Sequence, residues 1–120
     1  METTKRLYRL PPDFLASITL RPGPRGFLNG IRPNFCYGED PDQVTQYMIW
    51  PDFMDSSGNS LTADQSLAFG LPLNARMHIL DRDFVAFHMS RLSRGTRFYC
   101  MDGPRIVGDG VVTEVVPSPA

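Results

Sequence analysis

Two cysteines and two histidines are the side chains of this sequence best suited to metal binding or nucleophilic catalysis. Cys36, His78, His88 and Cys100 stand singly along the chain, in none of the close pairs that zinc sites use. A catalytic cysteine–histidine pair depends on proximity in the fold, and no recognisable signature of such an enzyme surrounds either cysteine. Cys100 aligns with apolar positions of a predicted strand, which favours a place in the core. We therefore expect no metal, no cofactor and no enzymatic activity.

Arginine is the second group with distinctive chemistry, because it supplies 11 of the 12 basic side chains. Guanidinium groups form forked contacts with phosphates and carboxylates. Several arginines could gather where strands end at one rim of a barrel, and such a group would hold an RNA backbone or an acidic protein surface. The alternative is that they are scattered and solvated. The arginines in question are Arg32, Arg91, Arg94, Arg97 and Arg105.

Aromatic side chains form the third group. Tyr47, Trp50 and Phe53 lie close together in the sequence, at the start of a long irregular segment. Large aromatic residues are enriched in the energetically important parts of binding surfaces, so these three are a candidate contact surface. Packing in the core is the alternative, and the exposure of Trp50 distinguishes the two.

Length and charge limit the class of protein that carries these residues. A chain of 120 residues fits one domain, 1–120, in which we place a barrel at about 8–116 and terminal arms at 1–7 and 117–120. The formal net charge of −1 gives no global attraction for nucleic acid. No run of 18 apolar residues occurs, so no membrane span is expected. Two isolated cysteines and the lack of a leader-like segment favour a cytoplasmic protein with free thiols.

Short strands are the elements that would position these side chains, because eleven prolines and ten glycines leave little room for helices. We interpret residues 84–89, apolar on both faces, as a short buried strand rather than a turn of helix. Residues 52–70 are interpreted as a loop with its own apolar anchors, in which a single helical turn near 63–69 is an alternative. Six or so strands predict an all-β fold, a single antiparallel β-barrel, since closure removes exposed edges. The other strands are predicted at 14–20, 32–37, 46–50 ending at Pro51, 73–80, and twice within 97–116.

The closing stretch, residues 97–116, has two unusual features. Gly108 and Gly110 interrupt its longer strand and suit a bulge or sharp bend at a barrel corner. In the preceding loop, Pro104 lacks the N–H that a two-residue type I′ turn centred on Asp102 and Gly103 would need, so a wider loop is predicted. That loop is either a binding loop or an ordinary turn. The valines expected to fill the core around the bend are Val107, Val111, Val112, Val115 and Val116.

Two blocks of this sequence resemble the C-terminal, third β-barrel domain of elongation factor Tu and related translation GTPases. The stretch RFYCMDGPRIVGDGVVTEVV at 97–116 is similar to the family's closing strands, and FLASITLRPGPRGFLNGIRPNFCYG at 14–38 to its first strands. Within the latter, the run from Gly30 to Phe35 fits the family's Gly-Tyr-Arg-Pro-Gln-Phe. No G-x-x-x-x-G-K-[ST] phosphate loop occurs. The resemblance therefore implies the third domain standing alone, with no GTPase domain and no nucleotide site.

The resemblance also implies a binding role. Arg32 falls on the arginine of the family's Arg-Pro pair, near its RNA-binding surface, and Asp102 and Gly103 fall on the closing loop that meets tRNA, with Arg105 just beyond it. Met101 replaces the family's cation in that loop, which removes one phosphate contact. We expect a non-catalytic binding domain, related to translation, with an RNA or protein partner. The alternative is a self-assembling accessory protein that uses the barrel as a scaffold and residues 52–70 as its interface.

Overall fold

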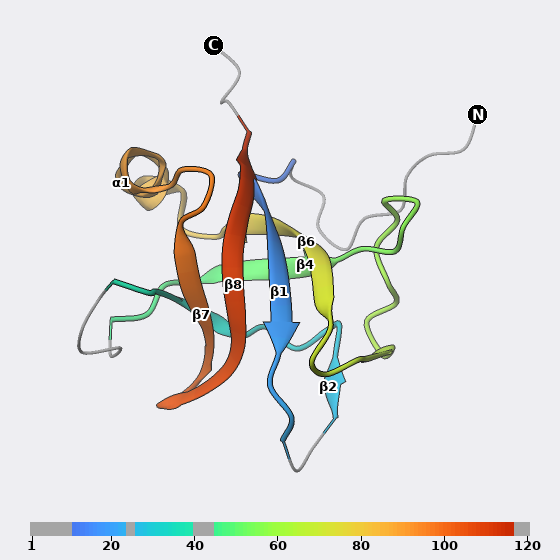
Figure 1. Ribbon diagram of the computed structural model, residues 1–120. Helices are drawn as coiled ribbons and strands as arrows, with labels where there is room; N and C mark the ends of the chain where they lie inside the picture. The colour runs from blue at the N-terminus through green and yellow to red at the C-terminus, as the bar shows by residue number, and fades with distance from the viewer. Residues whose placement is uncertain (1–10, 24–25, 40–44, 117–120) are drawn as a thin grey trace.

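The computed structural model describes residues 11–23, 26–39 and 45–116, and β-strands are its main regular structure (Figure 1). The predicted terminal arms, 1–7 and 117–120, lie outside these ranges. Neither helical segment in the described ranges is long and apolar enough to cross a membrane. The elements are β1 (Phe14–Leu20), β2 (Phe27–Leu28), β3 (Asn34–Tyr37), β4 (Ile49–Phe53), β5 (Ser66–Leu67), β6 (Pro72–Ile79), η1 (Arg82–Phe84), α1 (Val85–Arg91), β7 (Arg97–Asp102) and β8 (Arg105–Val115).

Six of the strands form one antiparallel sheet in the order β3-β7-β8-β1-β6-β4. The sheet curls, so that β4 and β6 cross behind β1, β7 and β8 (Figure 1). Its two edges meet where Phe35 of β3 and Tyr47, just before β4, exchange backbone hydrogen bonds of 2.9 and 2.8 Å. The strand number, the antiparallel pairing and the barrel-like curvature confirm the predicted all-β fold.

The core is organised around β1, as the alternation of its sequence predicts. Alternate side chains from Phe14 to Leu20 are at most 1% exposed. The rings of Phe35 and Phe98 stack with centroids 4.5 Å apart, and Phe14 meets both of them edge-on at 6.0 and 6.4 Å. These aromatic contacts tie β1, β3 and β7 together. Of the valines predicted to fill the core, Val107 and Val112 are buried and Val111, Val115 and Val116 are half-buried.

The glycines of β8 do not form the bulges that the sequence suggests. Gly108 and Gly110 pair regularly with residues of β7, and the register shifts fall at Val107 and Thr113 instead. The glycines provide space, because a Cβ added at Gly110 would lie 2.2 Å from the ring of Phe98. The aromatic ring thus occupies the volume that the missing side chain leaves. The sequence predicted a bulge or sharp bend at these glycines, and β8 does contain bulges, but they lie one residue before Gly108 and three residues after Gly110.

The third predicted strand is displaced toward the C-terminus. β4 begins at Ile49 rather than at residue 46, and Pro51, which was predicted to end it, lies in its middle. Among the strands of the described ranges, β4 stands last in the sheet order and pairs along its length with β6 alone. An edge strand has free positions that need no backbone donor, so it tolerates the proline.

Residues 84–89 are helical, and the prediction of a buried strand was wrong. A 3₁₀ turn begins after Asp81, whose carboxylate accepts a hydrogen bond from the Asp83 N–H, and α1 follows directly. Among the residues of α1 only His88 is buried, whereas Phe84 and Phe87 are 47% and 40% exposed. The apolar run therefore covers one flank of the barrel and does not enter the core.

The irregular segment 52–70 packs on the barrel, as predicted. Its strand β5 pairs with β2, and no helical turn forms where one was considered. The buried side chain of Asn29 donates to the Leu61 carbonyl and accepts from the Phe53 N–H, which fastens the segment from inside. Asp52 and Arg76, both buried, form an ion pair with 3.2 Å between Oδ2 and Nη2. These polar contacts hold the segment against β4 and β6.

Candidate binding pocket at the closing hairpin

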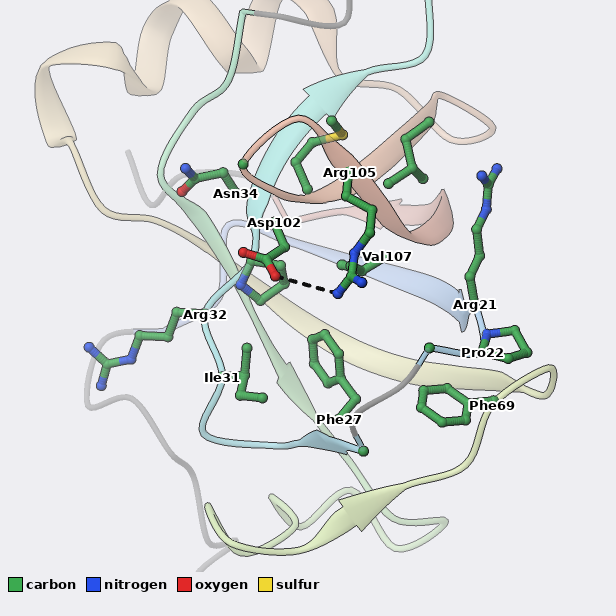
Figure 2. Close-up of a pocket in the computed structure, with 16 residues that line it drawn as sticks. Arg21, Pro22, Phe27, Ile31, Arg32, Asn34, Phe69, Asp102, Arg105 and Val107 are labelled. Atoms are coloured by element: carbon green, nitrogen blue, oxygen red, sulfur yellow. Dashed lines mark ion pairs between the residues drawn. The ribbon is translucent and has the colours of Figure 1, made fainter.

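A pocket of about 360 Å³ opens beside the turn that joins β7 to β8 (Figure 2). One wall is this turn and the start of β8. The opposite walls come from the chain after β1, from β2, and from the residues that lead into β3. These segments are far apart in the sequence, and the curled sheet brings them to one end of the barrel.

The floor of the pocket is apolar. Phe27 is 7% exposed and packs edge-on against the core ring of Phe53 with centroids 6.3 Å apart. Phe69 is half-buried, and Ile31 is 42% exposed at one side of the opening. Figure 2 shows Phe27, Phe69 and Ile31 along one side of the pocket, opposite Arg105. Such a floor can receive a ring or an aliphatic group of a ligand.

Arg105 is the arginine whose guanidinium points into the pocket in Figure 2. Its guanidinium extends from β8 toward Phe27, and its Nη2 lies 3.6 Å from Oδ2 of Asp102 (Figure 2). Both side chains of this ion pair are more than half exposed, at 55% and 74%. An exposed pair contributes little to stability, so Arg105 can exchange Asp102 for an anionic ligand at small cost.

The two other arginines at the opening have different roles. Nε and Nη2 of Arg21 each donate to the carboxylate of Asp109 at 2.7 Å, and this hydrogen bonding raises the pKa of Arg21. Arg32 extends away from the pocket, and its guanidinium carbon lies 4.9 Å from the centroid of the Trp50 ring. Arg21 is therefore held on β8, while Arg32 forms an outer rim that continues onto Trp50.

The turn beside the pocket is tight, and the prediction of a wider loop was wrong. Asp102 and Arg105 are paired across it, which leaves only Gly103 and Pro104 as turn residues. Gly103 has a φ of +57°, as the first position of a type II′ turn requires, and proline suits the second position. The carbonyl of Gly103 accepts a 2.7 Å hydrogen bond from Gln46 Nε2, which fixes the turn.

The structure brings together the four residues suggested by the resemblance. Arg32, Asp102, Gly103 and Arg105 all line this pocket. The wider group of arginines considered from the sequence is divided. Arg91 and Arg97 lie around the opposite end of β7, and Arg94 lies in the turn between α1 and β7, away from this pocket. Sequence reasoning missed Phe27 and Phe69, because only the fold shows that these apolar anchors face a shared opening.

The three aromatic residues considered as one contact surface have separate surroundings. Phe53 is fully buried in the core and so cannot contribute to a surface, which corrects that expectation. Tyr47 packs edge-on against the His88 ring at 4.7 Å, under α1. Trp50 is half-buried beside Arg32 and is the one that adjoins the pocket.

The histidines and cysteines do not form a chemical site within the described ranges, where no three His, Cys, Asp or Glu side chains could hold a metal ion. His88 is buried, its Nδ1 lies 2.7 Å from the hydroxyl of Tyr37, and burial lowers its pKa to about 4. Cys100 is in the core, as predicted, and burial raises the pKa of its thiol to about 12. Such a thiol stays protonated and unreactive.

Two comparisons with known proteins find no match for this chain. No family model matches the chain, and a search of curated proteins finds no match. The geometry of the pocket and the sequence resemblance are therefore the observations that bear on function.

Proposed function

We propose that this chain is a non-catalytic binding domain that holds RNA at the closing-hairpin pocket, in a role related to translation. The observation that supports this most is the gathering of Arg32, Asp102, Gly103 and Arg105 around a single opening. These are the positions that the resemblance to the third domain of elongation factor Tu associates with RNA. Arg105 at the centre and Arg32 at the rim supply cations on two sides of one opening.

The local charge is compatible with such a partner although the chain as a whole carries −1. Arg21, Arg32 and Arg105 line the opening, and among the described residues of its lining Asp102 is the only carboxylate. Arg21 is paired with Asp109 on β8, so Arg105 and Arg32 are the cations available to a phosphate chain at this opening. Phosphates that displace Asp102 from Arg105 would form charge-assisted, forked hydrogen bonds. Two or three such contacts give moderate, salt-dependent binding.

A salt titration tests the proposal directly. Fluorescence anisotropy with a labelled RNA hairpin that carries a single-stranded overhang gives the Kd at several salt concentrations. The Arg105→Ala variant should weaken binding and reduce the slope of log Kd against log salt by about 1, the loss of one phosphate contact. Arg94→Ala is the matched control, because it removes an exposed arginine outside the pocket. Equal losses in both variants, or no retention of RNA by the unaltered protein, would contradict the proposal.

Self-association is a second candidate, and one observation favours it. Met48, Phe84 and Phe87 are large apolar side chains that are 51%, 47% and 40% exposed, and they surround the flank at α1. None of the large apolar side chains exposed in the described ranges belongs to residues 52–70, so the proposed interface moves from that segment to α1.

Light scattering coupled to gel filtration tests this second candidate. A mass that rises with protein concentration, and that returns to the monomer value in the Phe84→Ser/Phe87→Ser variant, would support it. Leu71→Ser is the control, since Leu71 is 58% exposed and precedes β6 at its far end. A monomeric mass at every concentration would exclude self-association through this face.

A further inference from the structure

The size of the pocket limits what part of an RNA can enter it. Its volume of about 360 Å³ lies near the lower end of the range of small-molecule sites, roughly 300–1,000 Å³. One nucleotide fits such a space. A double helix is much wider than this space and cannot enter it, so it could contact only the exposed side chains around the opening.

The composition of the walls distinguishes a nucleotide from a phosphate group alone. A phosphate needs only cations and backbone donors, whereas this pocket places an apolar floor directly opposite its central arginine. Phe69 is half-buried and Ile31 is 42% exposed, so both present apolar surface at the opening even though the barrel core lies close beneath them. Nucleobases that leave a helical stack are received by aromatic and apolar side chains of this kind.

The arrangement of charges indicates where the phosphate would lie. Arg21 already gives two 2.7 Å hydrogen bonds to Asp109, which holds its guanidinium on β8. Within the described ranges, the ion pair that holds Arg105 is an exposed contact of 3.6 Å to Asp102, and the guanidinium of Arg105 points into the pocket. A phosphate can replace that carboxylate on Arg105 while the attached base lies on the floor.

We infer that the pocket takes one unstacked nucleotide of single-stranded RNA, with its phosphate on Arg105 and its base against Phe69 and Ile31. This inference rests on the proposed function, because it specifies which form of RNA the pocket recognises. It also explains why a cation and an apolar floor face one another across a space of nucleotide size.

Two forms of one RNA sequence and two small competitors test the inference. Fluorescence anisotropy compares a labelled single-stranded oligonucleotide with the same strand in a blunt duplex, and unlabelled uridine or adenosine monophosphate competes against the single strand. We expect the single strand to bind at least 10-fold more tightly than the duplex. The monophosphate should displace it, and inorganic phosphate at the same concentration and ionic strength should displace much less.

Two variants locate the base. Phe69→Ala should raise the Kd for the single strand about 5-fold or more, as loss of base stacking does, and leave the Kd for the duplex unchanged. Phe69 also packs against the core, so Ile31→Ser, at a more exposed position, provides a second variant that keeps the fold. Leu71→Ala is the control outside the pocket.

The outcomes separate the two proposals. Equal or tighter binding of the duplex, with no effect of Phe69→Ala and Ile31→Ser, would overturn the single-nucleotide site and leave RNA binding at Arg105 intact. Displacement by phosphate as effective as displacement by the monophosphate would likewise overturn it. A monophosphate that binds as tightly as the oligonucleotide would assign the pocket to a free nucleotide and overturn its assignment to RNA. Absence of any RNA binding would remove both proposals.

Discussion

Replacement of Gly110 by alanine should damage the barrel more than its small size suggests. A Cβ at this position would lie 2.2, 2.4 and 2.6 Å from three atoms of the Phe98 ring, where ordinary contacts begin at 3.4 Å. The ring cannot easily move, because it stacks on Phe35 at 4.5 Å and meets Phe14 edge-on. The added methyl group must therefore displace either a packed aromatic ring or the strand itself.

The expected cost follows from this overlap. Overpacking of a well-filled core costs roughly 1–3 kcal/mol. The Cβ would overlap three ring atoms by about 0.8 to 1.2 Å relative to ordinary contact at 3.4 Å, which places Gly110→Ala near the upper limit. For a domain of this length, about 3 kcal/mol corresponds to a fall in Tm of roughly 10 °C. Gly26→Ala is the control, because among the described residues the nearest atom to its Cβ would be Ser66 Oγ at 4.0 Å.

Urea unfolding followed by tryptophan fluorescence or circular dichroism gives the free energies, and a double-mutant cycle identifies the cause. In a Phe98→Leu background the ring atoms that clash are absent, so Gly110→Ala should cost less than 1 kcal/mol there. A cost of Gly110→Ala that is the same in both backgrounds would refute the steric explanation. A cost below about 1 kcal/mol in the unaltered protein would refute it as well.

Three further results are expected. Asp52→Ala should lower the free energy of unfolding by about 3–5 kcal/mol in urea titrations, because it leaves Arg76 buried without its anion, whereas loss of the exposed Arg21 pair should cost less than about 1 kcal/mol. The free energy of unfolding should fall as the pH drops from 6.5 toward 4, because the pKa of buried His88 is lowered and the unfolded chain binds a proton that the folded chain does not. The Tm of the His88→Gln variant should fall less over this interval, and identical pH profiles of Tm for the two proteins would contradict this mechanism. Both thiols, including Cys100, should resist a disulfide reagent at neutral pH until urea is added.

The local sequence pattern was sufficient to predict much of the barrel. The strict alternation of β1 predicts both its extent and its buried face, and the glycine-bounded closing strands predict a hairpin. Prediction from local pattern failed where the structural role of a residue depends on neighbours that are distant in the sequence. Pro51 ends a strand only if that strand needs donors on both sides, and the sequence alone does not show that β4 lies at an edge.

The predictions for the helical segment and for the tight turn were wrong for related reasons. Residues 84–89 contain His88, which is buried because it contacts Tyr37 of β3. Without knowledge of that contact, a segment that is apolar on both faces is predicted to be a buried strand. Asp81 was the available signal, because a side-chain cap before Asp83 is typical of a helix start. In the closing turn, Pro104 was judged against a type I′ geometry, whereas the positive φ of Gly103 allows a turn centred one residue later.

The residues proposed to bind RNA are different from those that stabilise the barrel, because the pocket lies at one end of the barrel and not in its core. Its cations come from exposed positions at the opening, where Arg32 contacts the face of Trp50 and Arg105 pairs weakly with Asp102. The residues that hold the barrel together lie on its inner face or in the buried Asp52–Arg76 pair. Substitution of Arg105 should therefore change RNA affinity with little change in Tm, and a parallel loss of both would show that the pocket arginine is structural. The proposed role in RNA binding thus depends on side chains that the fold itself does not require.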